Sequence, residues 1–423
     1  MRKTWIRDWG RRLLIALLLV SAVLLLRHTG YYAGIRSRLQ RSRSAAEQSA
    51  GTEATLAHPI EAIVPLAMTV RSTENGGRYG TAYDAADTAA VFQRFSVDLS
   101  EALGSAGAPA GFTDEEFRSS LERCCVAMHF AFPVRLELLS GWLGVDMNSP
   151  AAEHSARFLC ISAAEEEALL CYRTEDGSCY ACTTAVNADG FRGRTEEYAP
   201  NGALYAWEDD RLETDGETLL LDVLPTPAVL ASKIPLPREG EADAMLTAVG
   251  MNSFVTNSYT EADGTSVYIS DENTMRISES GTVLFRRAGF PDAETKDDLT
   301  TAVSRAWTTA KQCLGQFAGV GELRLVAVTQ NEALNSYTVL LDYAVDGIPV
   351  RLGSGHAAEI VVRGGKVIQA QMELRKFART ERNTDLLPCL QAAAIAARAQ
   401  GQPELVYAES GEATECMWVI TDG

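Results

Sequence analysis

The most strongly apolar part of the chain lies near its start. From Leu13 to Leu26, fourteen residues carry no charge, and eleven of them are Leu, Ile or Val. As a helix this run is about 21 Å long, shorter than the ~30 Å hydrocarbon layer of a bilayer, so its length also fits the core of a signal peptide. Aromatic residues flank the run and no small-x-small cleavage pattern follows it, which favours an uncleaved transmembrane helix over 13–35. The small residues on which a partner helix would pack are Ala16, Ser21 and Ala22.

The segments on either side of this run determine the predicted topology. Five basic residues precede the run and five follow it, so the count of positive charges does not choose an orientation. A short tail before a long downstream body is the usual arrangement of a signal anchor, and we therefore expect residues 1–12 in the cytoplasm. Residues 36–58 are rich in Ser, Ala, Arg and Thr and predict a polar stalk. Residues 59–423, which we call the body, are then expected outside the cytoplasm, in a single-pass protein of the cell membrane.

The first part of the body shows mixed periodicity. Helical spacing is present over 85–103 and 114–130, and the second helix begins with a capping box, Thr113-x-x-Glu116. From 156 to 224, short alternating runs predict antiparallel hairpins. Their expected turns are Asp176-Gly177, Asp189-Gly190 and Asp215-Gly216. A proline-rich stretch follows and predicts a domain boundary near residue 238.

The C-terminal half alternates between helix and strand patterns. One apolar helical stripe covers 299–317, after a capping pattern from Thr295 to Asp298. A second helix is predicted over 386–400 with Asp385 as its cap. Strands are predicted at 323–329, 337–345, 357–363 and 366–377, and two short strands end the chain. The final strand has no return strand and is expected at a sheet edge; the alternatives are pairing with another chain or a sequence that ends early.

A looser copy of this arrangement precedes it. Residues 242–251 are helix-like, and strands are predicted at 254–260, 265–269, 274–278 and 282–286. We therefore predict an α+β fold, in which an N-terminal transmembrane helix is followed by extracytoplasmic modules of curved antiparallel sheets, each packed with a helix. The predicted parts of the body are an N-terminal domain at 59–238, a middle module at 239–290 and a C-terminal module at 291–423.

Composition narrows the class of function. The 423 residues are 46% hydrophobic and 22% charged, which suits folded domains and not a disordered chain. With 38 Lys and Arg against 56 Asp and Glu, the net charge is -18. Nucleic-acid binding depends on a basic surface, so we expect no nucleic-acid partner.

The polar residues of the sequence form none of the common catalytic or cofactor motifs. The sequence contains no HExxH, no GxxxxGK[ST] and no GxGxxG pattern. The cluster Gly353-Ser354-Gly355-His356 has strand patterning on both sides, whereas a nucleophile elbow joins a strand to a helix, so a glycine-rich loop is the favoured interpretation. The acidic runs lack the oxygen spacing of a calcium loop. We expect no catalytic residue, no cofactor and no metal.

Nine cysteines are spread through the body. Cys179 and Cys182 form a CxxC, but in a hairpin pattern and not at the start of a helix, which argues against a redox motif. Buried thiols are the favoured interpretation. The alternative is a disulfide, most plausibly from Cys171 to Cys179 or Cys182.

Three parts of the sequence together carry a resemblance to a known family: the anchor and two stretches, SVYISDENTMRISESGTVLF at 266–285 and SYTVLLDYAVDGIPVRLGSGHAAEIVVRGGKVIQAQMELRKF at 336–377. With these parts the sequence resembles the YycH/YycI family of membrane-anchored regulators, whose outer modules are similar in architecture to PepSY domains. The resemblance covers the anchor and about 240–423, whereas residues 60–238 match only in position and length. The resemblance implies a non-enzymatic protein that acts with a second anchored protein of the family to restrain a sensor kinase of the WalK (YycG) type, largely through membrane helices.

The sequence therefore leaves three candidate functions. The favoured one is a membrane-anchored extracytoplasmic regulator of a two-component sensor histidine kinase, acting by protein–protein contacts. An envelope hydrolase is the second, and it requires a pocket with a carboxylate pair or a Ser/His couple. A domain that binds an extracellular peptide or wall fragment is the third, and it requires a deep, largely apolar groove.

Overall fold

The computed structural model describes residues 63–74, 76–164, 166–212, 217–270, 273–289, 298–410 and 413–422. All of them belong to one contact unit, Ala57–Gly423. The predicted tail, transmembrane helix and stalk, including Ala16, Ser21 and Ala22, lie outside the described residues. Among the helices of the described part, none is both long enough and apolar enough to cross a bilayer. The helices and large antiparallel sheets of these residues confirm the α+β class.

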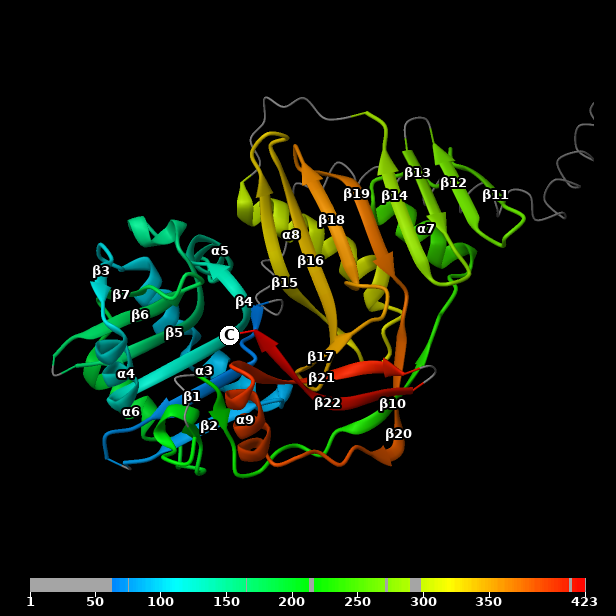
Figure 1. The fold of residues 1–423 in the computed structure, drawn as a ribbon. Helices are drawn as coiled ribbons and strands as arrows, with labels where there is room; N and C mark the ends of the chain where they lie inside the picture. The colour runs from blue at the N-terminus through cyan, green and yellow to red at the C-terminus, as the bar shows by residue number, and fades with distance from the viewer. Residues whose placement is uncertain are drawn as a thin grey trace, which may run out of the picture. The chain divides into compact units, whose positions relative to one another are not determined.

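Seven strands form the N-terminal sheet. They are β1 (Ala67–Arg71), β2 (Arg78–Ala82), β3 (Ala110–Phe112), β4 (Cys124–Arg135), β5 (Ser155–Ala163), β6 (Ala168–Thr174) and β7 (Cys179–Thr183). Their order is β2-β1-β4-β5-β6-β7-β3, and all neighbours are antiparallel (Figure 1). The β6–β7 hairpin turns at Asp176-Gly177, as predicted, with Gly177 at a φ of +84°.

Helices cover both faces of this sheet. They are α3 (Ala85–Gly104), α4 (Asp114–Glu122), α5 (Leu136–Trp142) and α6 (Ala188–Thr195), with a short 3-10 turn at Pro150–Glu153. Phe95 and Leu99 of α3 are buried in the same core as Met128, whereas Phe117 and Leu121 of α4 share a second core with the alternate residues of the strands. The central strands are therefore buried on both faces, because side chains alternate across a strand.

The C-terminal sheet is larger. Its strands are β10 (Ala228–Lys233), β11 (Asn257–Thr260), β12 (Ser266–Ser270), β13 (Asn273–Ile277), β14 (Thr282–Arg287), β15 (Glu322–Asn331), β16 (Ser336–Val345), β17 (Ile348–Arg351), β18 (Ala358–Arg363), β19 (Lys366–Glu373), β20 (Lys376–Asn383), β21 (Gly401–Ser410) and β22 (Ala413–Asp422). The order is β11-β12-β13-β14-β19-β18-β16-β17-β21-β22-β10-β20, and β15 pairs with β16. Its β21 and β22 run across the direction of β15, β16, β18 and β19 (Figure 1). A two-stranded sheet of β8 (Leu204–Tyr205) and β9 (Leu219–Leu220) completes the strands of the described residues.

Three helices accompany the C-terminal sheet: α7 (Glu239–Ala248), α8 (Leu299–Ala310), which continues as a π-helical turn at Lys311–Gly315, and α9 (Cys389–Arg398). The predicted stripe on α8 is buried, and so are the alternate residues of β16 from Tyr337 to Val345. Helix α8 packs on β16, β18 and β19, and α9 packs on β21. The two predicted modules share one sheet, because β14 pairs with β19 from Thr282 to Arg286.

Several predicted local features were wrong. The helix expected over 114–130 ends at Glu122, and its second half is the start of strand β4. The first five residues of β4 are all buried, so they lack the period-2 pattern that marks a strand. The Asp189-Gly190 turn lies inside α6, where the Asn187 side chain accepts the Gly190 N–H.

Two predicted helix caps also differ. Helix α9 begins after Pro388 and not after Asp385, because a proline disfavours helical geometry in the residue before it. Asp298 is itself the N-cap of α8 and accepts the Thr301 N–H, whereas the predicted box placed it at the third helical position; Thr295 lies outside the described residues.

The last strand, β22, is only partly at an edge. It pairs with β21 along its whole length and with β10 at Ala413 and Thr414. The strand expected at a sheet edge is therefore interior where it begins. The boundary near residue 238 stays a prediction, although β10, which precedes it, pairs with β20 and β22.

Candidate functional site between the two large sheets

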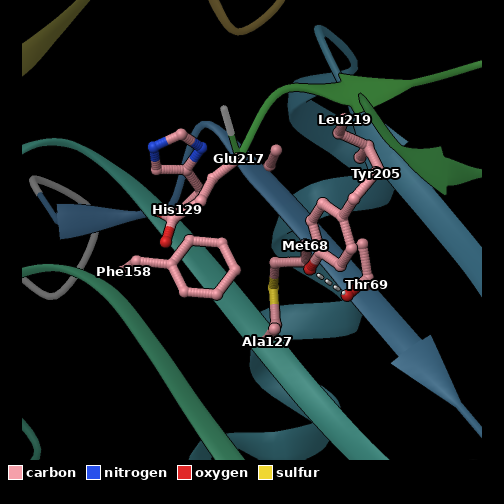
Figure 2. A pocket seen from close by; sticks show the side chains of 9 residues that line it. Met68, Thr69, Ala127, His129, Phe158, Tyr205, Glu217 and Leu219 are labelled. Atoms are coloured by element: carbon pink, nitrogen blue, oxygen red, sulfur yellow. Dashed lines mark hydrogen bonds between the residues drawn. The ribbon is translucent and has the colours of Figure 1, made fainter. Parts of the chain in front are cut away.

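A small pocket lies where β1, β4 and β5 meet the segment from Tyr205 to Leu219. It is lined by Ala67, Met68, Thr69, Ala127, His129, Phe158, Tyr205, Glu217 and Leu219. Figure 2 shows the His129 ring beside Phe158 and the hydrogen bond between Thr69 Oγ1 and the Tyr205 hydroxyl, which spans 2.9 Å. The pocket encloses about 10 Å³, close to the space of one water molecule. It is too small for a substrate.

Burial shifts the pKa values of His129 and Glu217 in the directions that favour their neutral forms. Desolvation lowers the pKa of His129 to about 3, and the positive charge of Arg157 acts in the same direction. Desolvation raises the pKa of Glu217, although the ion pair between its Oε1 and Arg173 Nη1, at 2.8 Å, opposes the shift. Since burial dominates in both cases, the pocket has the properties of a packed interior and not of an acid–base centre.

A larger cavity lies between the N-terminal sheet and the C-terminal one. It has a volume of about 450 Å³. Its lining, which defines what we call the inter-sheet cavity, is Leu66, Ala131, Arg157, Arg324, Leu325, Val326, Asp342, Tyr343, Ala344, Pro349, Arg351, Leu352, Gly355, His356, Glu404 and Thr421. A cavity of about 60 Å³ adjoins it and shares Leu66, Arg157, Glu404 and Thr421. The volume of the inter-sheet cavity falls in the range of small-molecule sites.

One histidine–carboxylate couple lies in this cavity. The Nδ1 atom of His356 is 3.0 Å from Oδ1 of Asp342, which also accepts the Ala357 N–H at 3.1 Å. His356 stands in the loop between β17 and β18, so the predicted glycine-rich loop between strands is confirmed. Among the described residues, no hydrogen bond joins the His356 ring to a Ser, Thr or Cys side chain. The couple therefore has no assembled nucleophile within this part of the chain.

The cysteines are all free and buried, as the buried-thiol interpretation predicted. The disulfide considered from Cys171 to Cys179 or Cys182 is absent. The strand register explains this, because Cys171 lies opposite Ala181 on β7 and opposite Cys160 on β5. Within the described ranges, no group of three or more His, Cys, Asp or Glu side chains is placed to hold a metal ion.

The cationic residues of the inter-sheet cavity were not predicted from the sequence. Arg157 lies on β5 and Arg324 on β15, and 167 positions separate them in the chain. No local pattern marks either of them, because each is one polar residue in an alternating strand. Only the contact between the sheets brings both to one cavity.

No protein-family model matches the chain, and no curated protein matches it in sequence. A solved structure matches in fold: that of YycH from Bacillus subtilis, with a TM-score of 0.54 and 11% sequence identity over 87% of this chain and 95% of that chain. The chain has a YycH-like fold. This confirms the suspected resemblance at the level of fold. A match over 87% of the chain extends well beyond residues 240–423, so the YycH-like fold takes in most of the N-terminal part, which matched only in position and length in sequence.

Proposed function

We propose that this protein is a membrane-anchored, extracytoplasmic regulator of a two-component sensor histidine kinase. The observation that carries the proposal is the YycH-like fold over 87% of the chain, joined to the apolar run at Leu13–Leu26. In this proposal the N-terminus is cytoplasmic, and the body acts by protein–protein contacts without catalysis. The partners are the membrane, the sensor kinase and a second single-pass regulator of the same family.

The membrane helix makes the regulatory contact in this proposal. Helices in lipid associate by close packing at small residues, and the anchor offers Ala16, Ser21 and Ala22. Ser21 and Ala22 follow Ala16 by five and six residues. Neither spacing is close to a whole number of helical turns, so neither residue lies on the same helix face as Ala16. Each is therefore tested singly, by replacement with Leu. At least one replacement is expected to weaken association with the partner, while Leu18→Ile, which changes no small residue, is not.

The decisive experiment replaces Leu13–Leu26 with an unrelated apolar helix of the same length. Loss of regulation with normal membrane insertion and normal protein level is expected. Crosslinking in native membranes, followed by identification of the captured proteins, is expected to recover a sensor kinase or a second single-pass regulator. Full regulation by the swapped protein would reject the role of the helix. Capture of neither partner, or a body found in the cytosol, would reject the proposal as a whole.

The hydrolase alternative is tested separately. It assigns general-base chemistry to the His356–Asp342 couple, the one histidine–carboxylate couple lining the inter-sheet cavity. If this alternative held, His356→Gln would abolish a hydrolytic activity of the purified chain on peptide or glycan. In the regulatory proposal the same replacement leaves kinase regulation unchanged.

A further inference from the structure

Two arginines of the inter-sheet cavity have no acidic partner. The Nε atom of Arg157 and the Nη1 atom of Arg324 are buried without a hydrogen-bond partner. Among the described residues, no carboxylate forms an ion pair with either side chain. Burying a guanidinium group without compensation costs free energy, so buried arginines normally have partners. The acidic excess of this chain, 56 Asp and Glu against 38 Lys and Arg, makes the missing partners more notable.

The acids that line the cavity are already engaged. Asp342 accepts from the Ala357 N–H and contacts His356, as described above. Glu404 accepts from Arg351 Nη2 at 2.6 Å. These contacts leave Arg157 and Arg324 as the cations of the cavity that no lining carboxylate neutralises.

Charges outside the cavity do not supply a partner either. Glu322, the acidic residue that acts on Arg324, is exposed to solvent on the same strand. Desolvation lowers the pKa of Arg324 despite that charge. Glu217 lines the small pocket and not this cavity; the charge of Arg157 lowers its pKa, but its ion pair is with Arg173. The cavity therefore combines positive charge with a volume of about 450 Å³.

We propose that the inter-sheet cavity binds a small organic anion, whose carboxylate or phosphate group is held by Arg157 and Arg324. The planar guanidinium fork matches both groups, and the resulting hydrogen bonds are charge-assisted. The less polar remainder of the ligand lies against Pro349 and Leu352, which line the same cavity. Arg157 belongs to the N-terminal sheet and Arg324 to the C-terminal one. Bound anion thus stabilises the contact between the two sheets.

This inference is independent of the proposed kinase partner. It concerns only the described body, and its test needs neither the kinase nor a regulatory readout. A failed crosslinking experiment leaves it standing, and a failed binding experiment leaves the membrane-helix proposal standing.

The test measures binding of two probes to the purified full chain in detergent by isothermal titration calorimetry. Citrate presents carboxylates and phenyl phosphate presents a phosphate, so their order of affinity identifies the preferred group. At least one probe is expected to bind. Arg157→Gln and Arg324→Gln are each expected to raise its Kd about tenfold or more, since each removes a charge-assisted contact. The matched control is Arg286→Gln, on the exposed face of β14, which should leave the Kd unchanged.

Stability without ligand supplies the second measurement. Because neither arginine has an acidic partner, Arg157→Gln and Arg324→Gln are expected to leave the unfolding midpoint without ligand unchanged or to raise it. Both are expected to abolish the rise in midpoint that the probe produces in the unmodified chain. The inference is overturned if neither probe binds at about 10 mM, a concentration that detects even weak affinity. It is also overturned if both variants bind the probe as the unmodified chain does, or if both lower the ligand-free midpoint.

Discussion

The indole N–H of Trp142 donates a hydrogen bond to the Ser304 hydroxyl across 3.2 Å. Trp142 ends α5 beside the N-terminal sheet, and Ser304 lies within α8 beside the C-terminal one, so this bond joins the helices of the two sheets. Both side chains are buried. The neighbouring Gly141 shows how closely the two helices approach here. A Cβ atom on this residue would lie 2.9 Å from the Thr300 hydroxyl oxygen.

Ser304→Ala is expected to lower the free energy of unfolding by about 1–3 kcal/mol, because it leaves the Trp142 N–H buried without an acceptor. Urea denaturation followed by circular dichroism measures the change. Thr308→Ala, one turn later on α8, is the control and should change stability by less than about 0.5 kcal/mol. In a double-mutant cycle with Trp142→Phe, the two effects should be clearly non-additive. Additivity would show that the bond contributes nothing.

The ion pair between Arg194 and Asp98 gives a second prediction. Arg194 Nε donates to Asp98 Oδ2 at 2.9 Å, and its Nη2 donates to Oδ1. The Asp98 side chain is only 2% exposed, whereas that of Arg194 is 29% exposed. Asp98→Ala should therefore lower the free energy of unfolding by roughly 2–3 kcal/mol, less than for a fully buried pair, because water can solvate the freed guanidinium.

The same helix contains the matched control for this experiment. On α6, Arg192 pairs with Asp189 at 2.8 Å, but the Asp189 side chain is 95% exposed. Exposed pairs contribute little, so Asp189→Ala should leave the unfolding midpoint unchanged within error. Equal losses in Asp98→Ala and Asp189→Ala would contradict the burial argument.

His129 predicts a dependence of stability on pH. Its folded pKa of about 3 lies below the ordinary value of 6.5, so between these values the unfolded chain binds a proton that the folded chain does not. The contribution of His129 is therefore complete above pH 6.5 and is lost progressively as the pH falls towards 3. Glu217 has the opposite effect on stability. Because burial raises its pKa, the folded chain binds a proton at Glu217 at a higher pH than the unfolded chain does, which favours the folded chain as the pH falls. The charges that face the ring are those of Arg157 and, across the pocket, Glu217.

NMR titration of the His129 ring tests this directly. Its resonance should not titrate between pH 5 and 8, the range in which an ordinary histidine does. In denaturation experiments, His129→Leu should reduce the loss of stability between pH 6.5 and 4 relative to the unmodified chain. A ring that titrates near pH 6.5 in the folded protein would contradict the prediction.

Elements with one buried face were predictable from the sequence, and elements with two were not. The stripe of α8 and the alternation on β16 each follow the period of their own structure, and both are present. An Asp-Gly or Ser-Gly pair between two strand patterns predicts a turn, and Asp263-Gly264 and Ser280-Gly281 form such turns, with both glycines at positive φ. In contrast, the first five residues of β4 are buried on both faces, and this continuous apolar run was indistinguishable from half of a helix.

The periodicity of the sequence does not predict which distant strands pair with each other. A pattern shows which face of β14 is buried, but not that its edge pairs with β19. The same limit applies to the inter-sheet cavity, since Arg157 and Arg324 come together only through the contact of two sheets. The sequence therefore predicted many of the helices and strands of this part, and it did not predict the shared sheet or the cavity.

The buried thiols give the last prediction. The thiolate is the reactive form of cysteine, and burial raises the pKa of Cys125, Cys313 and Cys416 to about 12. The hydrogen bond with Cys160 lowers the pKa of Cys171, but that sulfur is buried like those of the other eight cysteines. In the folded protein at pH 8, a disulfide reagent such as DTNB should therefore label no cysteine rapidly, and after unfolding in guanidinium chloride it should label all nine.

Under mild destabilisation, Cys179 should react first. At 5% exposure it is the most accessible of the nine. Burial raises the pKa of Cys179, but Arg173 Nε donates to its sulfur at 3.2 Å and opposes that shift. Cys179→Ser is expected to remove the earliest phase of labelling, measured by mass spectrometry at increasing urea. Cys313→Ser, deep under the C-terminal sheet, should leave that phase intact. The reagent reaches a thiol only where its cover is lost. Fast labelling of the native chain, or an early phase that survives Cys179→Ser, would therefore contradict the prediction and show that the protein opens first around another cysteine.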